Sequence, residues 1–103
     1  VNIYPAEIEG VLANHASVLD VAVFGIPNEE FGEEVKAAVE LVPGVIGDAG
    51  LAETLAAYCR ENLAGYKTPR TFDFVQDMPR HETGKLYKRK LRDPYWEGTG
   101  RLI

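Results

Sequence analysis

Two runs rich in β-branched residues constrain the fold of this chain more than any other feature of its sequence. The first run covers residues 18–26 and ends beside Pro27-Asn28, and the second covers residues 35–42 and ends at Pro43-Gly44. β-branched residues favour strands, whereas Pro-Asn and Pro-Gly dipeptides favour turns. The two runs therefore predict a pair of antiparallel strands joined by a turn.

Further segments complete a small α+β domain. Helical spacing of apolar residues predicts one helix with Pro5 in its first turn and another with Leu55 and Cys59 on a single face. Phe72 and Phe74 alternate with polar residues as a third strand requires. The predicted helices are 5–14, 51–63 and a basic helix 85–92, and the third strand is 70–76. This order predicts a small, mostly antiparallel sheet of about three strands covered by helices, followed by an unassigned tail, 93–103.

The composition is that of a single globular domain. The chain has 103 residues, of which 46% are hydrophobic and 26% charged, and this size and balance suit one soluble core. Cys59 is the one cysteine in the sequence, which excludes an internal disulfide and a zinc cluster and favours a cytoplasmic location. No apolar run approaches the ~20 residues of a membrane span. Because the chain starts at Val1 and enters a helix almost at once, we expect it to be a piece of a longer protein.

Positive charge is concentrated near the end of an acidic chain. Between Met78 and Arg92 six basic residues stand against one acid, so this segment carries +5 although the whole chain carries −5. A basic patch of this kind attracts phosphate-bearing small molecules or polyanions. The alternative is that the basic residues after Lys85 form only the solvated face of a terminal helix. Nucleic-acid binding is disfavoured because no aromatic residues line a basic groove.

The most informative segment is the loop Met78-Pro79-Arg80-His81-Glu82-Thr83-Gly84-Lys85, which lies just ahead of the predicted basic helix. Glycine lets a backbone bend sharply and approach a ligand, and lysine carries a compact charge on a long stem. Lys85 is therefore a candidate for reaching into another domain. A Gly-Lys pair alone is weak evidence, since surface lysines often follow glycine by chance.

Pro79, Gly84 and Lys85 resemble the Pro-x-x-x-x-Gly-Lys motif of the adenylate-forming superfamily, which includes acyl-CoA synthetases, luciferases and peptide-synthetase adenylation domains. Three other segments resemble motifs of the same family in the same order, namely residues 2–9, 25–33 and 65–70. Asn28 stands where the family usually has Asp, and His81-Glu82 replace the small residues common before Thr-Gly-Lys. The resemblance covers the chain up to about the end of the predicted basic helix.

The resemblance implies that residues 1–103 are the C-terminal lid domain of a larger AMP-forming ligase, most like a fatty-acid–CoA ligase, whose N-terminal adenylation domain is absent. Such an enzyme converts ATP and a carboxylic acid to an acyl-adenylate and pyrophosphate, and then transfers the acyl group to CoA with release of AMP. Lys85 would be the catalytic residue of the first step, with Pro79, Thr83 and Gly84 positioning its loop. The isolated chain is expected to be inactive.

The resemblance also implies a second functional face, used after the domain has rotated as a rigid body. Asn2, Tyr4, Tyr66 and Lys67 are expected to lie on that face, with the lysine near a CoA phosphate. No metal ligand is expected in this chain, because magnesium would travel with ATP and be bound mainly by the absent domain. A peptide-synthetase-type adenylation domain that transfers to a carrier protein is the alternative, and a non-enzymatic basic-helix module is a remote one. CoA is favoured because no carrier domain follows before Ile103.

Overall fold

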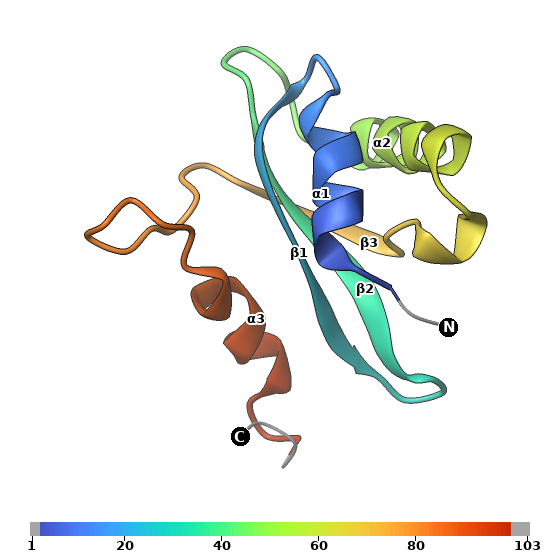
Figure 1. Cartoon of the computed structure of the whole chain (residues 1–103), viewed down its shortest axis with the longest axis vertical. Coiled ribbons are helices and arrows are strands. Elements are labelled where there is room, and N and C mark those ends of the chain that lie inside the picture. The colour runs from blue at the N-terminus through green and yellow to red at the C-terminus, as the bar shows by residue number, and fades with distance from the viewer. Residues whose placement is uncertain (1–2, 100–103) are drawn as a thin grey trace.

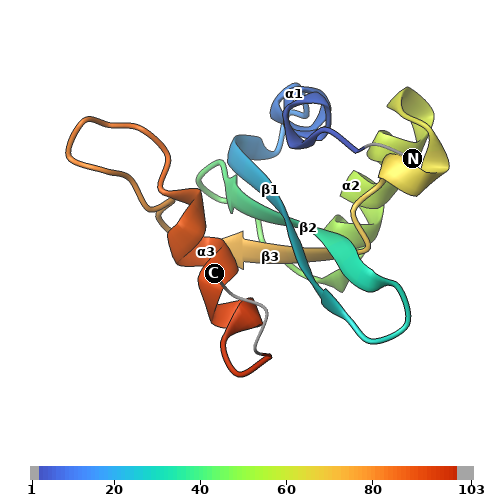
Figure 2. The ribbon, with the colours of Figure 1, turned by 60° about the horizontal axis from the view of Figure 1, so that its bottom comes forward.

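A three-stranded sheet lies between helices in the computed structural model, which describes residues 3–99 (Figure 1). Two helices cover one face of the sheet, and a third helix lies on the opposite side (Figures 1 and 2). The α+β fold predicted from the sequence is therefore confirmed. In chain order the elements are α1 (Pro5–Ala13), β1 (Val18–Asn28), β2 (Gly32–Leu41), α2 (Ala49–Asn62), the 3-10 helix η1 (Gly65–Lys67), β3 (Thr71–Val75) and α3 (Lys88–Trp96).

The sheet is mixed, with strand order β1-β2-β3. β1 and β2 are antiparallel from Val18–Leu41 to Asn28–Gly32, which confirms the predicted pair. Pro27 is tolerated within β1 because this is an edge strand, where a missing N–H interrupts no second ladder. β3 pairs with β2 in parallel, because the chain returns through α2 to the end of the sheet at which β2 begins.

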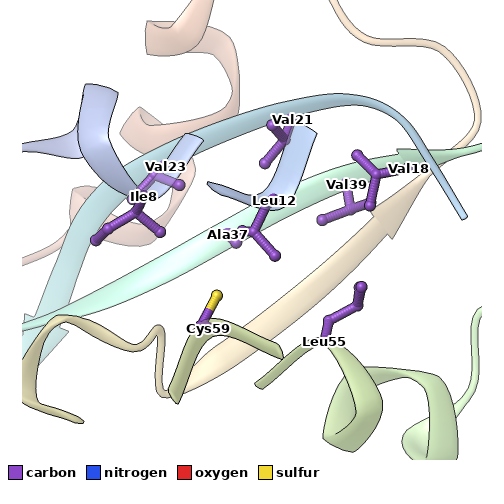
Figure 3. Packing of buried hydrophobic residues seen from close by; sticks show 9 residues of the cluster. All are labelled: Ile8, Leu12, Val18, Val21, Val23, Ala37, Val39, Leu55 and Cys59. Atoms are coloured by element: carbon purple, nitrogen blue, oxygen red, sulfur yellow. The ribbon is translucent and has the colours of Figure 1, made fainter. Parts of the chain in front are cut away.

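The main hydrophobic core fills the space between the sheet and the helices α1 and α2. Figure 3 shows how side chains from these helices point toward those of β1 and β2. The shared face that the sequence predicted for Leu55 and Cys59 is confirmed, since both side chains are buried in this core. The core residues are Ile8, Leu12, Val18, Val21, Val23, Ala37, Val39, Leu55 and Cys59. α2 begins two residues before the predicted start because the Asp48 carboxylate accepts a hydrogen bond from the Leu51 N–H and caps the helix.

A smaller cluster holds α3 against the other face of the sheet. Leu91 packs against Phe24 and Ile26, and the indole N–H of Trp96 donates to the Gly25 carbonyl over 2.9 Å. No helix within residues 3–99 combines the length and the apolar character that a membrane span requires.

The start and end predicted for the basic helix were wrong. α3 begins at Lys88, not at Lys85, because residues 85–87 belong to the returning arm of a hairpin. The helix continues past Arg92 into the segment left unassigned, and it contains Pro94. Packing of Trp96 on the sheet overrides the low helix propensity of proline at that position.

Candidate functional site

Residues 79–87 form a hairpin that projects from the body of the domain between β3 and α3. Its two arms are joined by an antiparallel bridge between Arg80 and Leu86. The main-chain N–H of Tyr87 also donates to the Pro79 carbonyl over 2.9 Å. Figures 1 and 2 show this segment as the extended orange loop beside α3. The sequence therefore builds an ordered turn here, with hydrogen bonds at its base.

The tip of the hairpin explains why a glycine precedes Lys85. The N–H of His81 donates to the Lys85 carbonyl over 2.8 Å, and the N–H of Gly84 donates to the His81 carbonyl over 2.8 Å. These bonds enclose residues 82–84, a three-residue loop of the kind that ends in a left-handed residue. Gly84 has that conformation, with φ +88°. Any side chain at this position would be strained, so glycine is required to direct the chain into Lys85.

Lys85 carries the one lysine ammonium within residues 3–99 that has neither a carboxylate nor an aromatic ring as partner. The side chain is exposed at the end of the tip. The ammonium groups of the other lysines are engaged: three pair with a carboxylate and Lys90 lies over the Tyr87 ring. The three paired with a carboxylate are Lys36, Lys67 and Lys88. The Lys85 charge is therefore available to a ligand or to another domain.

The base of the hairpin is fixed to the domain on both sides. Before the hairpin, the N–H of Met78 donates to the Glu40 carboxylate over 2.9 Å, and the Met78 side chain is buried. After it, the Lys88 ammonium pairs with the Glu9 carboxylate at 2.8 Å, and the same carboxylate oxygen accepts the N–H of Val23. The hairpin thus projects from a rigid support.

The residues predicted for a second functional face also lie together, around the start of α1 and η1. The Lys67 ammonium is 2.7 Å from a Glu7 carboxylate oxygen and 5.8 Å from the centroid of the Tyr66 ring. The hydrogen bond to Glu7 raises the pKa of Lys67, and Tyr66 and Tyr4 contribute in the same direction. Tyr4 and Tyr66 are both exposed. Asn2, the remaining residue predicted for this face, lies outside the described residues.

Glu7 is a member of this cluster that the sequence did not indicate. Its carboxylate pairs with the Lys67 ammonium, although 60 residues separate the two along the chain. Contacts between residues so far apart leave no local pattern in the sequence. Any anion that binds Lys67 must therefore share it with Glu7 or displace Glu7.

The two sets of residues lie at opposite ends of the domain. The 79–87 hairpin and the η1 end point away from each other in two views of the molecule (Figures 1 and 2). Pro79, Thr83, Gly84 and Lys85 thus lie in one hairpin. Tyr4, Tyr66 and Lys67 lie in a separate cluster. Within residues 3–99 no group of three His, Cys, Asp or Glu side chains is arranged to hold a metal ion.

The fold is that of the C-terminal domain of acyl-CoA synthetases. The crystal structure of a Brucella canis acyl-CoA synthetase superposes with a TM-score of 0.86 at 37% sequence identity, covering 92% of this chain and 18% of that one. Residues 7–85 match the family model described as the AMP-binding enzyme C-terminal domain. The chain belongs to that family.

Curated relatives agree with this assignment. The chain is 47% identical to a long-chain-fatty-acid–CoA ligase from Yersinia pestis over 93 residues, which are 89% of this chain and 16% of the relative. It is 37% identical to a fatty acid–[acyl-carrier-protein] ligase from Streptomyces coeruleorubidus over 102 residues, 99% of this chain and 19% of the relative. The chain therefore spans less than a fifth of the length of these relatives.

Proposed function

We propose that this chain is the mobile C-terminal domain of a larger ATP-dependent acid–CoA ligase and that Lys85 is its adenylation lysine. The observation that carries the proposal is the exposed Lys85 ammonium, which has no carboxylate or aromatic partner within residues 3–99, at the tip of a rigidly based hairpin. Family membership supports it, since the match to the family model extends to residue 85.

The first step joins two negatively charged reactants. A carboxylate oxygen of the acid attacks the α-phosphorus of ATP, a new O–P bond forms, and the bond to the leaving pyrophosphate breaks. Negative charge is concentrated around the phosphorus during this displacement. A compact ammonium positioned there stabilises the transition state more than the separated reactants. Lys85 supplies that charge, and Pro79, Thr83 and Gly84 shape the hairpin that presents it.

In the second step the CoA thiol attacks the acyl carbon, a C–S bond forms, and AMP leaves. The face around Tyr4, Tyr66 and Lys67 is the candidate for this step, together with Asn2. Lys67 would meet a CoA phosphate in place of Glu7. Because the two faces lie at opposite ends of the domain (Figure 1), one domain serves both steps by rotating between them as a rigid body. Magnesium would accompany ATP and be held mainly by the rest of the enzyme.

A carrier protein is the second candidate for the acyl acceptor. It is favoured by the fatty acid–[acyl-carrier-protein] ligase that matches almost the whole chain at 37% identity. A peptide-synthetase-type adenylation domain would use the same kind of acceptor. The names of both curated relatives described above specify a fatty acid, and we propose a fatty acid as the substrate here.

The proposal is tested with the full-length protein that contains this chain. Pyrophosphate release is measured across a panel of fatty, aryl and amino acids with ATP and magnesium. AMP release is then measured with either CoA or a holo carrier protein, which bears a free thiol, as the acyl acceptor. We expect pyrophosphate release with fatty acids and AMP release with CoA. Absence of acid-dependent pyrophosphate release would overturn the proposal, whereas AMP release with the carrier protein alone would establish the second acceptor. The 103-residue chain by itself is expected to form no acyl-adenylate.

A further inference from the structure

We infer that Arg80 and Asp20 are positioning residues for Lys85, forming a brace between the hairpin tip and strand β1. The inference rests on the proposed role of Lys85 in adenylation. Asp20 was not indicated by any sequence pattern, and Arg80 was noted only as one basic residue of the loop. The two residues are 60 positions apart along the chain.

Arg80 makes two contacts with one guanidinium group. One terminal nitrogen, Nη1, donates to the Gly84 carbonyl over 2.9 Å, and the other pairs with the Asp20 carboxylate. The Gly84 carbonyl belongs to the peptide bond that joins Gly84 to Lys85. Because the guanidinium is planar and its donors form a rigid fork, the two contacts fix the orientation of that peptide group relative to β1.

Asp20 is itself held in place by its strand. Its Oδ1 accepts the N–H of Val21 over 2.9 Å, which leaves Oδ2 for Arg80. The pairing of β1 with β2 shifts register between Val18 and Asp20. Irregularities of this kind re-aim a side chain at the edge of a sheet. The carboxylate is therefore a fixed support on the most extensively paired part of the domain.

The brace is too exposed to contribute much to folding. The Arg80 and Asp20 side chains are 46% and 28% exposed, and ion pairs in such positions add little to stability. The hydrogen bonds within residues 79–87 do not connect the tip of the hairpin to the sheet. The brace makes this connection and therefore fixes how the tip is oriented relative to β1. A displacement of the reacting group by about 1 Å is enough to slow an enzyme on the order of 10²-fold.

The competing explanation is that Arg80 binds a substrate phosphate directly. The two explanations make opposite predictions for Asp20. If Arg80 bound phosphate, Asp20 would compete for its charge, and removal of Asp20 would leave adenylation unchanged or faster. If Arg80 positions Lys85, removal of Asp20 releases the brace and slows adenylation.

The experiment uses the full-length protein with Asp20→Ala, Arg80→Lys, Arg80→Ala and the double variant Asp20→Ala/Arg80→Ala. Adenylation is measured by pyrophosphate release, and the thioester step by CoA-dependent turnover of supplied acyl-adenylate. We expect each single variant to lower the kcat of adenylation about 10- to 10²-fold, with KM for ATP, the thioester step and the unfolding temperature nearly unchanged. Arg80→Lys keeps the charge but loses the two-point fork, so it should also be slow. The double variant should be no slower than Arg80→Ala, because both changes remove one brace.

Arg60→Ala is the matched control, because Arg60 forms an exposed ion pair with Glu53 on α2, away from the hairpin. It should leave both steps unchanged. Full adenylation by Asp20→Ala, or equal losses in both steps together with a lowered unfolding temperature, would overturn the inference. Lys85→Ala in the same assays separates the two proposals. If Lys85→Ala still forms acyl-adenylate at the parent rate, the proposed function fails. If Lys85→Ala loses adenylation while the Asp20 and Arg80 variants adenylate at the parent rate, only the inference about the brace is wrong.

Discussion

At the scale of single residues, Lys36 is a charged residue that the fold buries. Its side chain is 7% exposed, and it donates to the Asp73 carboxylate at 2.7 Å. The Tyr95 hydroxyl donates to the other oxygen of Asp73, and the Tyr95 ring lies 5.0 Å from the ammonium. A buried charge is tolerated only when it is paired in this way. The three residues thus connect β2, β3 and α3, which carries the hairpin on its N-terminal side.

Tyr95 gives this connection a pH dependence. Partial burial and the hydrogen bond to Asp73 raise the pKa of Tyr95 to about 12, compared with ~10 for an unfolded tyrosine. The folded state therefore holds the phenol proton more tightly. The stability that this provides is fully present below pH ~10 and is lost as the pH rises toward ~12.

We therefore predict that Tyr95→Phe reduces the dependence of stability on alkaline pH. At neutral pH the variant should lose at most about 1 kcal/mol, the value of one partly exposed hydrogen bond. Its free energy of unfolding, measured with urea, should then fall less between pH ~10 and ~12 than that of the parent chain. Tyr66→Phe, at an exposed tyrosine, should follow the parent. An equally steep fall in Tyr95→Phe and the parent would show that Tyr95 is not the group responsible.

At the scale of elements, α2 closes the main core through the face that carries Leu55 and Cys59. Both residues are fully buried. Burial raises the pKa of the Cys59 thiol to about 11, so the thiolate that would react with an electrophile is scarce at neutral pH. The cysteine is therefore a packing residue and a probe for opening of this element.

We predict that iodoacetamide leaves Cys59 unmodified in the native chain and modifies it once the chain unfolds. Leu55→Ala, one turn away on the same face, should cost about 2–5 kcal/mol and accelerate the modification in proportion to the population of the open state. Leu19→Ala, at an exposed leucine, should behave as the parent does. Mass spectrometry of timed samples measures the modification. Alkylation of the native parent as fast as in denaturant would contradict the packing role.

Elements that local residue patterns mark were predictable from the sequence. The β1–β2 pair follows from the β-branched residues of 18–26 and 35–42 and from the turn dipeptides that end these runs. The buried face of α2 follows from the helical spacing of Leu55 and Cys59. The parallel direction of β3 was not predictable, since it is decided by the path of the chain through α2.

Contacts between distant segments account for the rest of what the sequence left open. The start of α3 at Lys88 depends on a hairpin that withdraws residues 85–87 from the helix. The Asp20–Arg80 pair and the Glu7–Lys67 pair each join residues 60 positions apart. Charged residues at such separations form no local pattern, so the motif located Lys85 without showing what supports it.

At the scale of the whole molecule, the domain carries its two candidate functional faces at opposite ends (Figure 1). Lys85 belongs to the 79–87 hairpin, and Lys67 belongs to η1 beside Tyr66. These two segments lie at opposite ends of the domain in Figure 2. In the proposed ligase, a single orientation of this domain against the rest of the enzyme would expose one end to the reacting groups at a time. This geometry supports the proposed rotation between the two steps.

We predict that Lys67→Ala in the full-length protein affects the thioester step alone. Loss of one charge-assisted hydrogen bond to a CoA phosphate is worth about 1.5 kcal/mol, so KM for CoA should rise about tenfold. Acid-dependent pyrophosphate release should stay at the parent rate. Arg60→Ala, which removes a cation from an exposed pair elsewhere, serves as the control. A CoA dependence identical to that of the parent would remove Lys67 from the proposed face.

The central claim is that Lys85 acts in adenylation, and the most direct measurement compares the two half-reactions of Lys85→Ala in the full-length protein. Pyrophosphate release from acid and ATP should fall about 10²- to 10³-fold, the cost of removing one transition-state stabilising group. Thioester formation from supplied acyl-adenylate should continue at the parent rate. Adenylation at the parent rate, or an equal loss in both half-reactions, would contradict the account.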